Sequence, residues 1–411
     1  MLPVFRSTFI IAIVFVMSSC AKIAVEDGEK IEAIFLKTVT GTKNSKSATI
    51  LIHSDKLKLH VKSAAGFIEI EKNKIPITPD QPFHVASIGK VFTSVLIFNL
   101  IETGKLSLND SVKKILGSEM LEHLYVYEGI DLSDKVTVSH LLSHTSGVDD
   151  YFESVDKKGK SVLKEITLEP NKFWTPKELL DFTRSNQKAV ARPGEKFHYS
   201  DSGYILLGLV IEKISGKSFE SNLQEKIFFP LGMKKSYMHL RSEPLDKPST
   251  PISTMMLGDT DVTNFKSISA DWSGGGIIST TEDLLIFQQA LIKGKLVSDK
   301  HYQSMKGSLK FMSGIYYGKG LMTVRFGDMS FFMPKTPDLH GHSGLLSTLL
   351  FYSPEYDVHI IANLGSTDDI EGSFGMLFWI MQYLKEISLA ACRVTHQVCL
   401  QPGIAEGMPA N

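Results

Sequence analysis

The stretch Phe83-His84-Val85-Ala86-Ser87-Ile88-Gly89-Lys90-Val91-Phe92 opens a segment that stays apolar on nearly every side as far as Glu102. This pattern predicts a helix buried within a domain, with Gly104 as its stop. On such a helix the side chains of Ser87 and Lys90, three residues apart, are neighbours on one face. Burial lowers the pKa of a lysine, so Lys90 could take the proton of Ser87 near neutral pH and make it a nucleophile.

The Ser-x-x-Lys spacing is weak evidence by itself, because the chain repeats it at Ser111/Lys114, Ser154/Lys157, Ser161/Lys164 and Ser185/Lys188. None of those four pairs stands at the entrance of a strongly apolar helix. For Ser87 the alternative is a helix with a capping serine and a lysine whose ammonium reaches solvent. Other motifs must decide between a catalytic pair and a helix cap.

Short β-rich segments lie towards both ends of the chain, and helical patterns lie between them. Strands are expected at 48–53, 58–63, 66–71, 311–324, 345–353 and 358–363, followed by an amphipathic helix at 372–388. This order predicts an α+β fold, in which N- and C-terminal strands build one antiparallel sheet flanked by helices. A mostly helical region is inserted at about 91–300, and the domain is expected to span 46–390.

Two helix starts in the inserted region have capping-box sequences. Thr175-Pro176-Lys177-Glu178 adds a proline at the first helical position, and Ser279-Thr280-Thr281-Glu282 precedes the apolar run 284–292. Each box predicts a helix whose first N–H groups are capped by a hydroxyl side chain.

Five motifs, in order, resemble the signatures of the serine β-lactamase-related hydrolases, the class C β-lactamase or CubicO-type family. They are 83–112 around Ser87, Leu141-Leu142-Ser143-His144-Thr145-Ser146-Gly147, 192–204, Asp271-Trp272-Ser273-Gly274-Gly275-Gly276, and Gly341-His342-Ser343-Gly344 followed by Ser353-Pro354-Glu355. The resemblance implies the β-lactamase/DD-peptidase-like fold. It also implies an acyl-enzyme mechanism that uses neither a metal nor an organic cofactor.

The resemblance assigns a role to each site residue. Ser87 is the nucleophile, Lys90 is its base, and Tyr199 helps to relay the proton of the nucleophile to the leaving group. The backbone N–H groups of Ser87 and of Leu345, which follows Gly344, match the two donors of the oxyanion hole.

Two positions depart from the family pattern. Asp201 stands where the Tyr-x-Asn motif has asparagine, so it cannot offer an amide donor to a substrate carbonyl. It can accept a hydrogen bond from Lys90 or from a substrate amine, or it can have a purely structural role. His342 replaces the lysine of the Lys-Thr-Gly motif, and a mostly neutral imidazole attracts a substrate carboxylate less strongly than lysine does.

These departures favour a serine hydrolase that acts through an acyl-enzyme on esters or amides, of the esterase or D-amino-acid peptidase type. Its partner is then a small-molecule, peptide or ester substrate. A β-lactamase or penicillin-binding DD-carboxypeptidase is one alternative, and a non-catalytic cell-wall binding protein is another. Substrate choice is expected to depend on loops at 149–174 and 240–265.

The net charge argues against a nucleic-acid-binding protein, and the histidine pattern argues against a metalloenzyme. The 411 residues carry a formal net charge of -1, which provides no overall field to attract a nucleic acid. His140 with His144, and His340 with His342, have metal-ligand spacing, but neither pair has a third ligand nearby, so no metal site is expected.

The first residues resemble the sorting signal of a bacterial lipoprotein. Arg6 precedes an apolar run at 9–17, short for a membrane span, which ends at Ser18-Ser19-Cys20. We expect a signal peptide at 1–19, a lipid on Cys20 that anchors an exported, periplasmic or cell-surface protein to a membrane, and a flexible spacer at 20–45. An uncleaved anchor and a plain signal peptide are the alternatives.

The other two cysteines, Cys392 and Cys399, stand close together in a C-terminal tail at 391–411. An oxidising compartment would permit a disulfide between them.

Overall fold

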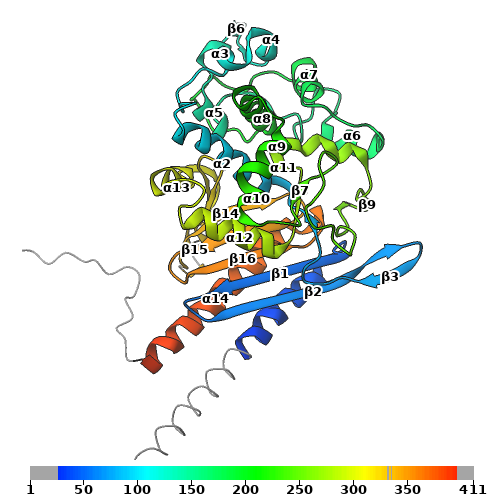
Figure 1. Ribbon diagram of the computed structural model, residues 1–411, viewed down its shortest axis with the longest axis vertical. Coiled ribbons are helices and arrows are strands. Elements are labelled where there is room, and N and C mark those ends of the chain that lie inside the picture. Colours follow the sequence, from blue (N-terminus) through cyan, green and yellow to red (C-terminus); the bar gives the residue numbers. More distant parts are fainter. Residues whose placement is uncertain (1–25, 331–332, 335, 396–411) are drawn as a thin grey trace, which may run out of the picture.

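The computed structural model describes residues 26–330, 333–334 and 336–395 (Figure 1). The predicted signal peptide, Cys20 and Cys399 lie outside these residues, as does the side chain of Cys392. No helix in the described ranges is long and apolar enough to span a membrane.

A nine-stranded antiparallel sheet joins the two ends of the chain (Figure 1). At its centre β1 (Ser47–Ser54) pairs with β16 (Val358–Asn363), and Ile50 lies opposite Ala362. In spatial order the strands are β11 (Leu309–Met312), β12 (Ile315–Tyr317), β13 (Met322–Val324), β14 (Leu339–Gly344), β15 (Thr348–Ser353), β16, β1, β2 (Leu59–Ile70) and β3 (Asn73–Pro76). The predicted α+β fold class, with one sheet from N- and C-terminal strands, is confirmed.

Two predicted strand regions are divided differently in the structure. The segments predicted at 58–63 and 66–71 form one continuous strand, β2. The segment predicted at 311–324 forms three strands, because turns containing Gly314 and Gly320 interrupt it. Both glycines have positive φ, +71° and +100°, a conformation that glycine adopts at little cost.

A helix over residues 26–41 corrects the prediction of a flexible spacer at 20–45. Its residues Ile31, Phe35 and Val39 are four apart, so they share one helical face, and all three are buried. They join an apolar cluster that also contains residues of the sheet and of the C-terminal helix α14 (Ile370–Thr395). Figure 1 shows both helices below the sheet. Burial of this short stripe, between polar residues, stabilises the helix.

The region between β3 and β11 is mostly helical and lies above the sheet in Figure 1. Its α-helices are α2 (Gly89–Glu102), α3 (Val112–Leu116), α4 (Ser118–Leu121), α5 (Val138–Leu142), α6 (Val162–Leu168), α7 (Pro176–Asn186), α8 (Asp201–Ser215), α9 (Phe219–Leu223), α10 (Phe229–Leu231), α11 (Trp272–Gly275), α12 (Thr281–Ile292) and α13 (Asp299–Met305). Two 3₁₀ segments matter for the site: η1 (Ala86–Ile88) and η4 (Lys266–Asp271). Among the short strands, β10 (Ile277–Ser279) pairs with β4 (Phe83–His84) on one side and with β7 (Tyr237–Met238) on the other. Two further pairs are β5 (Val126–Tyr127) with β6 (Ile130–Asp131), and β8 (Met256–Leu257) with β9 (Thr260–Asp261).

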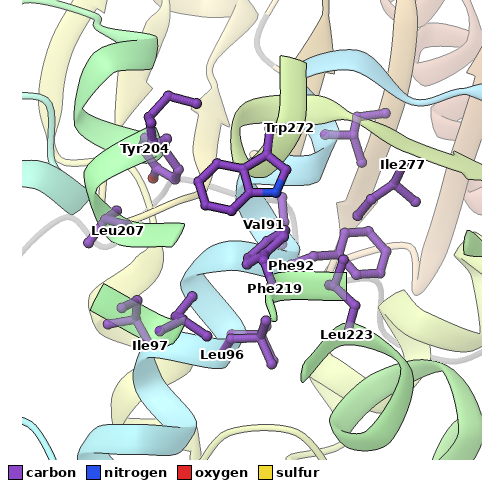
Figure 2. Close-up of a cluster of buried hydrophobic side chains, with 14 of the residues drawn as sticks. Val91, Phe92, Leu96, Ile97, Tyr204, Leu207, Phe219, Leu223, Trp272 and Ile277 are labelled. Atoms are coloured by element: carbon purple, nitrogen blue, oxygen red, sulfur yellow. The ribbon is translucent and has the colours of Figure 1, made fainter. Parts of the chain in front are cut away.

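Helix α2 lies within the main apolar core, as its sequence predicts. Its residues 89–98 are all buried. Figure 2 shows Phe92 and its neighbours packed among side chains of other elements. Phe92 stacks on Phe287 with ring centroids 3.7 Å apart, and Trp272 meets Phe219 edge-on at 5.4 Å. Because α12 also contacts β1 and β16, this packing fixes the start of α2 beside the sheet.

The two predicted capping boxes have different outcomes. The Thr175 box is present, with reciprocal hydrogen bonds between Thr175 and Glu178. In α12, the N-cap is Thr280 rather than Ser279, and its side chain accepts from the Asp283 N–H. Ser279 is instead the last residue of β10, where its hydroxyl pairs with that of Ser236.

Candidate active site

Ser87 lies in the 3₁₀ turn η1, which leads directly into α2. The turn begins at Ala86 with a φ of +50°, a strained conformation for a residue other than glycine. The neighbouring sheet supports it, since Thr348 Oγ1 donates a hydrogen bond of 2.8 Å to the Val85 carbonyl. A Cβ on Gly344 would stand 2.7 Å from the Ala86 Cβ. The close approach of β14 thus requires glycine at 344 and holds the turn that presents Ser87.

Lys90 lies one helical turn after Ser87 and is completely buried. Its Nζ donates hydrogen bonds of 3.0 Å to the Ser87 Oγ and of 3.0 Å to the Gly274 carbonyl. A Cβ on Gly274 would stand 2.6 Å from the Asp201 Oδ1, so only glycine fits in this turn beside the ammonium group. The predicted nucleophile and base are therefore in direct contact.

Asp201 begins α8, and its Oδ1 lies 2.5 Å from Lys90 Nζ. Its side chain is 6% exposed, so the pair is shielded from water. Burial lowers the pKa of Lys90, but the negative charge of Asp201, with a further contribution from Tyr199, outweighs burial and raises that pKa above its usual value. The expectation of a lysine with a lowered pKa is thus wrong, because it did not include a buried carboxylate partner.

Tyr199 lies across the site from α2 and is held by His144. The two rings stack with centroids 4.2 Å apart, and His144 Nδ1 accepts the Ser200 N–H at 3.0 Å. Lys90 Nζ lies 5.1 Å from the Tyr199 ring centroid, and the phenol interacts with both Lys90 and Ser87. Burial raises the pKa of Tyr199, against the charge of Lys90, so the phenol keeps its proton in the resting site.

Leu345 follows the last residue of β14 and lines two cavities together with Ser87. The strand packs against η1, which brings residues 344–345 beside the nucleophile. The two predicted oxyanion-hole donors thus belong to segments that lie side by side.

His342 is completely buried in β14 and does not form part of the cleft wall among the described residues. Its Nδ1 lies 2.6 Å from the Ser343 carbonyl, and its Nε2 lies 3.1 Å from the Tyr317 hydroxyl. Burial, together with the charge of Lys90, lowers the pKa of His342 to about 3. The predicted substrate contact by His342 is therefore corrected, since a neutral ring faces Tyr317 instead.

An open cleft of about 990 Å³ begins at Ser87 and crosses the edge of the sheet. Tyr199 lines it, and so do Phe311, Met322, Phe374 and Trp379 with other mostly apolar side chains. Sequence analysis missed the contribution of α14, because the helix is adjacent to the site only through the sheet topology. The stripe of Phe374 and Phe378 was the available signal.

A second, narrow pocket of about 40 Å³ reaches Ser87 from the other side. Both predicted specificity loops contribute to it: Phe152, Leu163 and Ile166 come from 149–174, and Met255, Leu257 and Val262 come from 240–265. His84, Leu345 and Asp271 complete much of the wall. Ser87 thus lines two cavities of different size.

Two further carboxyl groups, not assigned from the sequence, surround the Lys90–Asp201 pair. Asp150 accepts the Asp201 N–H at 2.8 Å, and burial, reinforced by the charge of Asp201, raises its pKa to about 7. Asp271 ends η4, and burial, again with Asp201, raises its pKa to about 7 against the effect of Lys90. Their backbone partners and loop positions come from the fold, so sequence spacing could not reveal them.

The histidine pairs have structural neighbours. His140 completes a capping box with Thr137 at the start of α5, and His340 Nδ1 lies 3.0 Å from the Thr323 hydroxyl. Within the ranges that the structure describes, no three His, Cys, Asp or Glu side chains form a cluster suited to a metal ion.

The fold and the contact between Ser87 and the buried Lys90 define a protein of the β-lactamase/DD-peptidase-like class. The model of the Beta-lactamase family matches residues 48–369, and the chain belongs to this family. Penicillin-binding protein 4* of Bacillus subtilis is 29% identical over 272 residues, which cover 62% of this chain and 55% of that protein. The chain therefore matches little more than half the length of this curated relative.

Solved structures share the fold at lower identity. The D-amino acid amidase from Ochrobactrum anthropi, in complex with L-phenylalanine amide, has a TM-score of 0.72 and is 21% identical, covering 88% of this chain and 99% of its own. EstCE1, described as a hydrolase with promiscuous acyltransferase activity, has a TM-score of 0.69 and 18% identity, with coverage of 88% and 99%.

Proposed function

We propose that this protein is a serine hydrolase that cleaves esters or amides through an acyl-enzyme on Ser87. The observation that carries the proposal is the 3.0 Å contact between Ser87 Oγ and the Nζ of a fully buried Lys90. A lysine with only a structural role would gain more from reaching solvent than from lying beside a hydroxyl. The contact places the nucleophile within hydrogen-bond distance of a group that can accept its proton.

The Lys90–Asp201 pair supplies the base in this mechanism. At rest Lys90 is charged, as its raised pKa requires, and the reactive state is the minor tautomer in which its proton has moved to the carboxylate 2.5 Å away and left a neutral amine. The lone pair of Lys90 then accepts the proton of Ser87 as Oγ attacks the substrate carbonyl carbon. The tetrahedral oxyanion is stabilised by the N–H groups of Ser87 and Leu345.

Collapse of the intermediate breaks the bond to the leaving group. The Tyr199 phenol donates its proton to the departing oxygen or nitrogen and is reprotonated from Lys90, which returns the proton taken from Ser87. Water then attacks the acyl-enzyme along the same route, and release of the acid restores Ser87.

The open cleft favours neutral or cationic substrates over anionic ones. Its acidic side chains are Asp150, Glu153 and Glu371, and no lysine or arginine lines it among the described residues. Because His342 is buried and neutral, the cation that would attract the carboxylate of a penicillin is missing there. Esters and amides, such as D-amino-acid derivatives, are therefore preferred over β-lactams. The likeness to an amidase and to EstCE1 agrees with this preference.

A substrate panel tests the proposal. Nitrophenyl esters, D-alanyl amides and nitrocefin are compared on wild type and on Ser87→Ala. We expect ester or amide turnover at least about tenfold more efficient than nitrocefin turnover, and a loss of more than about a hundredfold in the variant. A wild type without turnover would support the non-catalytic cell-wall binding protein, and nitrocefin as best substrate would support a β-lactamase.

The proposed location is outside the cytoplasm, on a membrane, through a lipid on Cys20. The support is the order of Arg6, the apolar run 9–17 and Ser18-Ser19-Cys20.

A further inference from the structure

The two cavities at Ser87 indicate where each half of a substrate, the acyl group and the leaving group, binds. Tyr199 lines the open cleft, whereas the described wall of the narrow pocket does not include it. In the mechanism above Tyr199 protonates the leaving group, and a proton donor must be within hydrogen-bond reach of the atom it protonates. The leaving group therefore lies in the open cleft, and the acyl group lies in the narrow pocket.

The narrow pocket has room for a small acyl group only. Its volume of about 40 Å³ corresponds to about three water-sized spheres. Most of its wall is apolar, with Phe152, Leu163, Met255 and Leu345 among the lining residues. The polar side chains in this wall, besides Ser87 itself, are His84, Asp271 and Thr367. A hydrogen atom, a methyl group and one polar substituent would fill such a space.

The Asp271 carboxylate is poorly satisfied by the protein itself. Its nearest basic neighbour in the described ranges is His84, whose Nε2 lies 3.8 Å from Oδ2, and burial lowers the pKa of His84 to about 3, so the ring is neutral. His84 is 2% exposed and its Nδ1 accepts the Ala86 N–H at 3.2 Å, so the ring is fixed and its Nε2 lacks a hydrogen-bond partner. The Asp271 side chain is 16% exposed, so this carboxylate without a cationic partner can be reached by a ligand, and it lies beside a buried ring nitrogen without a hydrogen-bond partner.

The backbone directs this carboxylate towards the nucleophile. Trp272, the next residue, has a φ of +23°, while its indole is anchored in the core against Phe219 (Figure 2). A Cβ on Gly275 would lie 2.7 Å from the Ala86 carbonyl oxygen and 3.0 Å from Asp271 Oδ2. Asp271 and the residue before Ser87 are thus separated by little more than one backbone segment. Residues with positive φ, such as Ala86 and Trp272, are found more often at functional sites than elsewhere.

We propose that Asp271 binds the protonated α-amino group of the acyl half of the substrate, so that the enzyme acts on amides or esters of small α-amino acids. This inference rests on the proposed function and names its substrate class. An ammonium group in the pocket makes a charge-assisted hydrogen bond to Asp271, which no neutral acyl group can make. The raised pKa of Asp271 agrees with a carboxylate that lacks a cation until substrate arrives.

The test compares two p-nitroanilides that differ only in the amine. Alanine p-nitroanilide, in D and L forms, carries the α-amino group, and propionic acid p-nitroanilide lacks it. We expect wild type to prefer the better alanyl enantiomer at least about tenfold in kcat/KM. In Asp271→Asn, which keeps the shape and removes the charge, this ratio falls at least about tenfold. Glu119→Gln, which removes an exposed carboxylate from α4 outside both cavities, is the matched control and keeps the wild-type ratio.

The outcomes separate the two proposals. An alanyl-to-propionyl ratio near one in wild type overturns the amine site while leaving the serine hydrolase intact, and so does an unchanged ratio in folded Asp271→Asn. Failure of fluorophosphonate to label Ser87, with neither anilide cleaved, overturns the proposed function. If Asp271→Asn does not fold, two wild-type measurements still test the amine site. The proposal then requires the alanyl preference of at least about tenfold and a lower kcat/KM for phenylalanine p-nitroanilide than for alanine p-nitroanilide, because the narrow pocket excludes a benzyl side chain. A phenylalanyl anilide that is cleaved as well as the alanyl one overturns the placement of the acyl group.

Discussion

Lys90 Nζ and Asp201 Oδ1 lie 2.5 Å apart in a site shielded from water, with the Ser87 hydroxyl on the other side of the ammonium group. The asparagine of the family motif would leave Lys90 without this counterion. With aspartate at position 201, the proton of the pair can lie on either Lys90 or the carboxylate. Of the roles that the sequence left open for Asp201, the structure has the one in which its carboxylate lies beside Lys90.

Asp201→Asn should change the pH dependence of catalysis. The wild-type pair is active with one proton shared between two groups, so activity persists until a second proton binds at acid pH. In the variant, the amide at position 201 cannot accept the proton of Lys90, so Lys90 must lose that proton to solvent before it can act as a base. We expect the acid limb of the kcat/KM profile to move to higher pH by at least about one unit. Glu371→Gln, in the cleft wall, should leave the acid limb in place, and an acid limb that does not move in Asp201→Asn would refute the shared-proton mechanism.

Asp271→Asn should stabilise the folded protein at alkaline pH. The pKa of Asp271 is about 7 in the folded chain, against about 3.9 in an unfolded one. Between these values the folded state binds more protons, so the contribution of Asp271 to stability falls as pH rises and is fully unfavourable above pH 7.

Urea unfolding at two pH values measures this effect. We expect Asp271→Asn to exceed wild type by on the order of 2 kcal/mol at pH 8 and by little at pH 4. The exposed Glu371→Gln should show no such dependence. A variant that is less stable than wild type at pH 8 would mean that Asp271 is well satisfied in the fold.

His342→Lys should destabilise the protein rather than create a binding site for β-lactam carboxylates. Residue 342 is completely buried against Tyr317 and close enough to Lys90 for that charge to lower its pKa. A second buried cation there costs about 3 kcal/mol in the free energy of unfolding. His340→Lys, half-buried on the same strand, is the control with a smaller cost. A stable His342→Lys with improved nitrocefin turnover would place residue 342 at the cleft.

Cys20→Ser should release the protein from membranes, because the proposed lipid would be attached through the cysteine sulfur. Fractionation of cells that express wild type and variant measures this. If the variant stays in the membrane fraction, the apolar run at 9–17 is itself the anchor.

The sequence predicted most of the fold because its patterns were local. The apolar segment after Lys90 and the strands at 48–53 and 358–363 are each a continuous run of mostly apolar residues, and the structure has them where expected. The helix over 26–41 was missed, since only three apolar residues form its stripe and their partners are in α14.

The site was less predictable than the fold. Ser87, Lys90 and Tyr199 belong to motifs, and the structure brings them together. The environment of Lys90, by contrast, depends on Asp150, Asp201 and Asp271, which converge from three different elements. The direction of the pKa shift of Lys90 followed from that convergence, and no spacing in the chain encodes it. The same holds for His342, whose burial depends on Tyr317 from β12.

The central claim is that Ser87 is a nucleophile activated by Lys90, and covalent labelling tests it most directly. Wild type, Ser87→Ala and Lys90→Ala are incubated with a fluorophosphonate at pH 7.5, and intact mass with peptide mapping locates the adduct. We predict one adduct on Ser87 in wild type, none in Ser87→Ala, and labelling slowed at least about a hundredfold in Lys90→Ala. An adduct on another serine, or equal labelling of Ser87→Ala, would contradict the account.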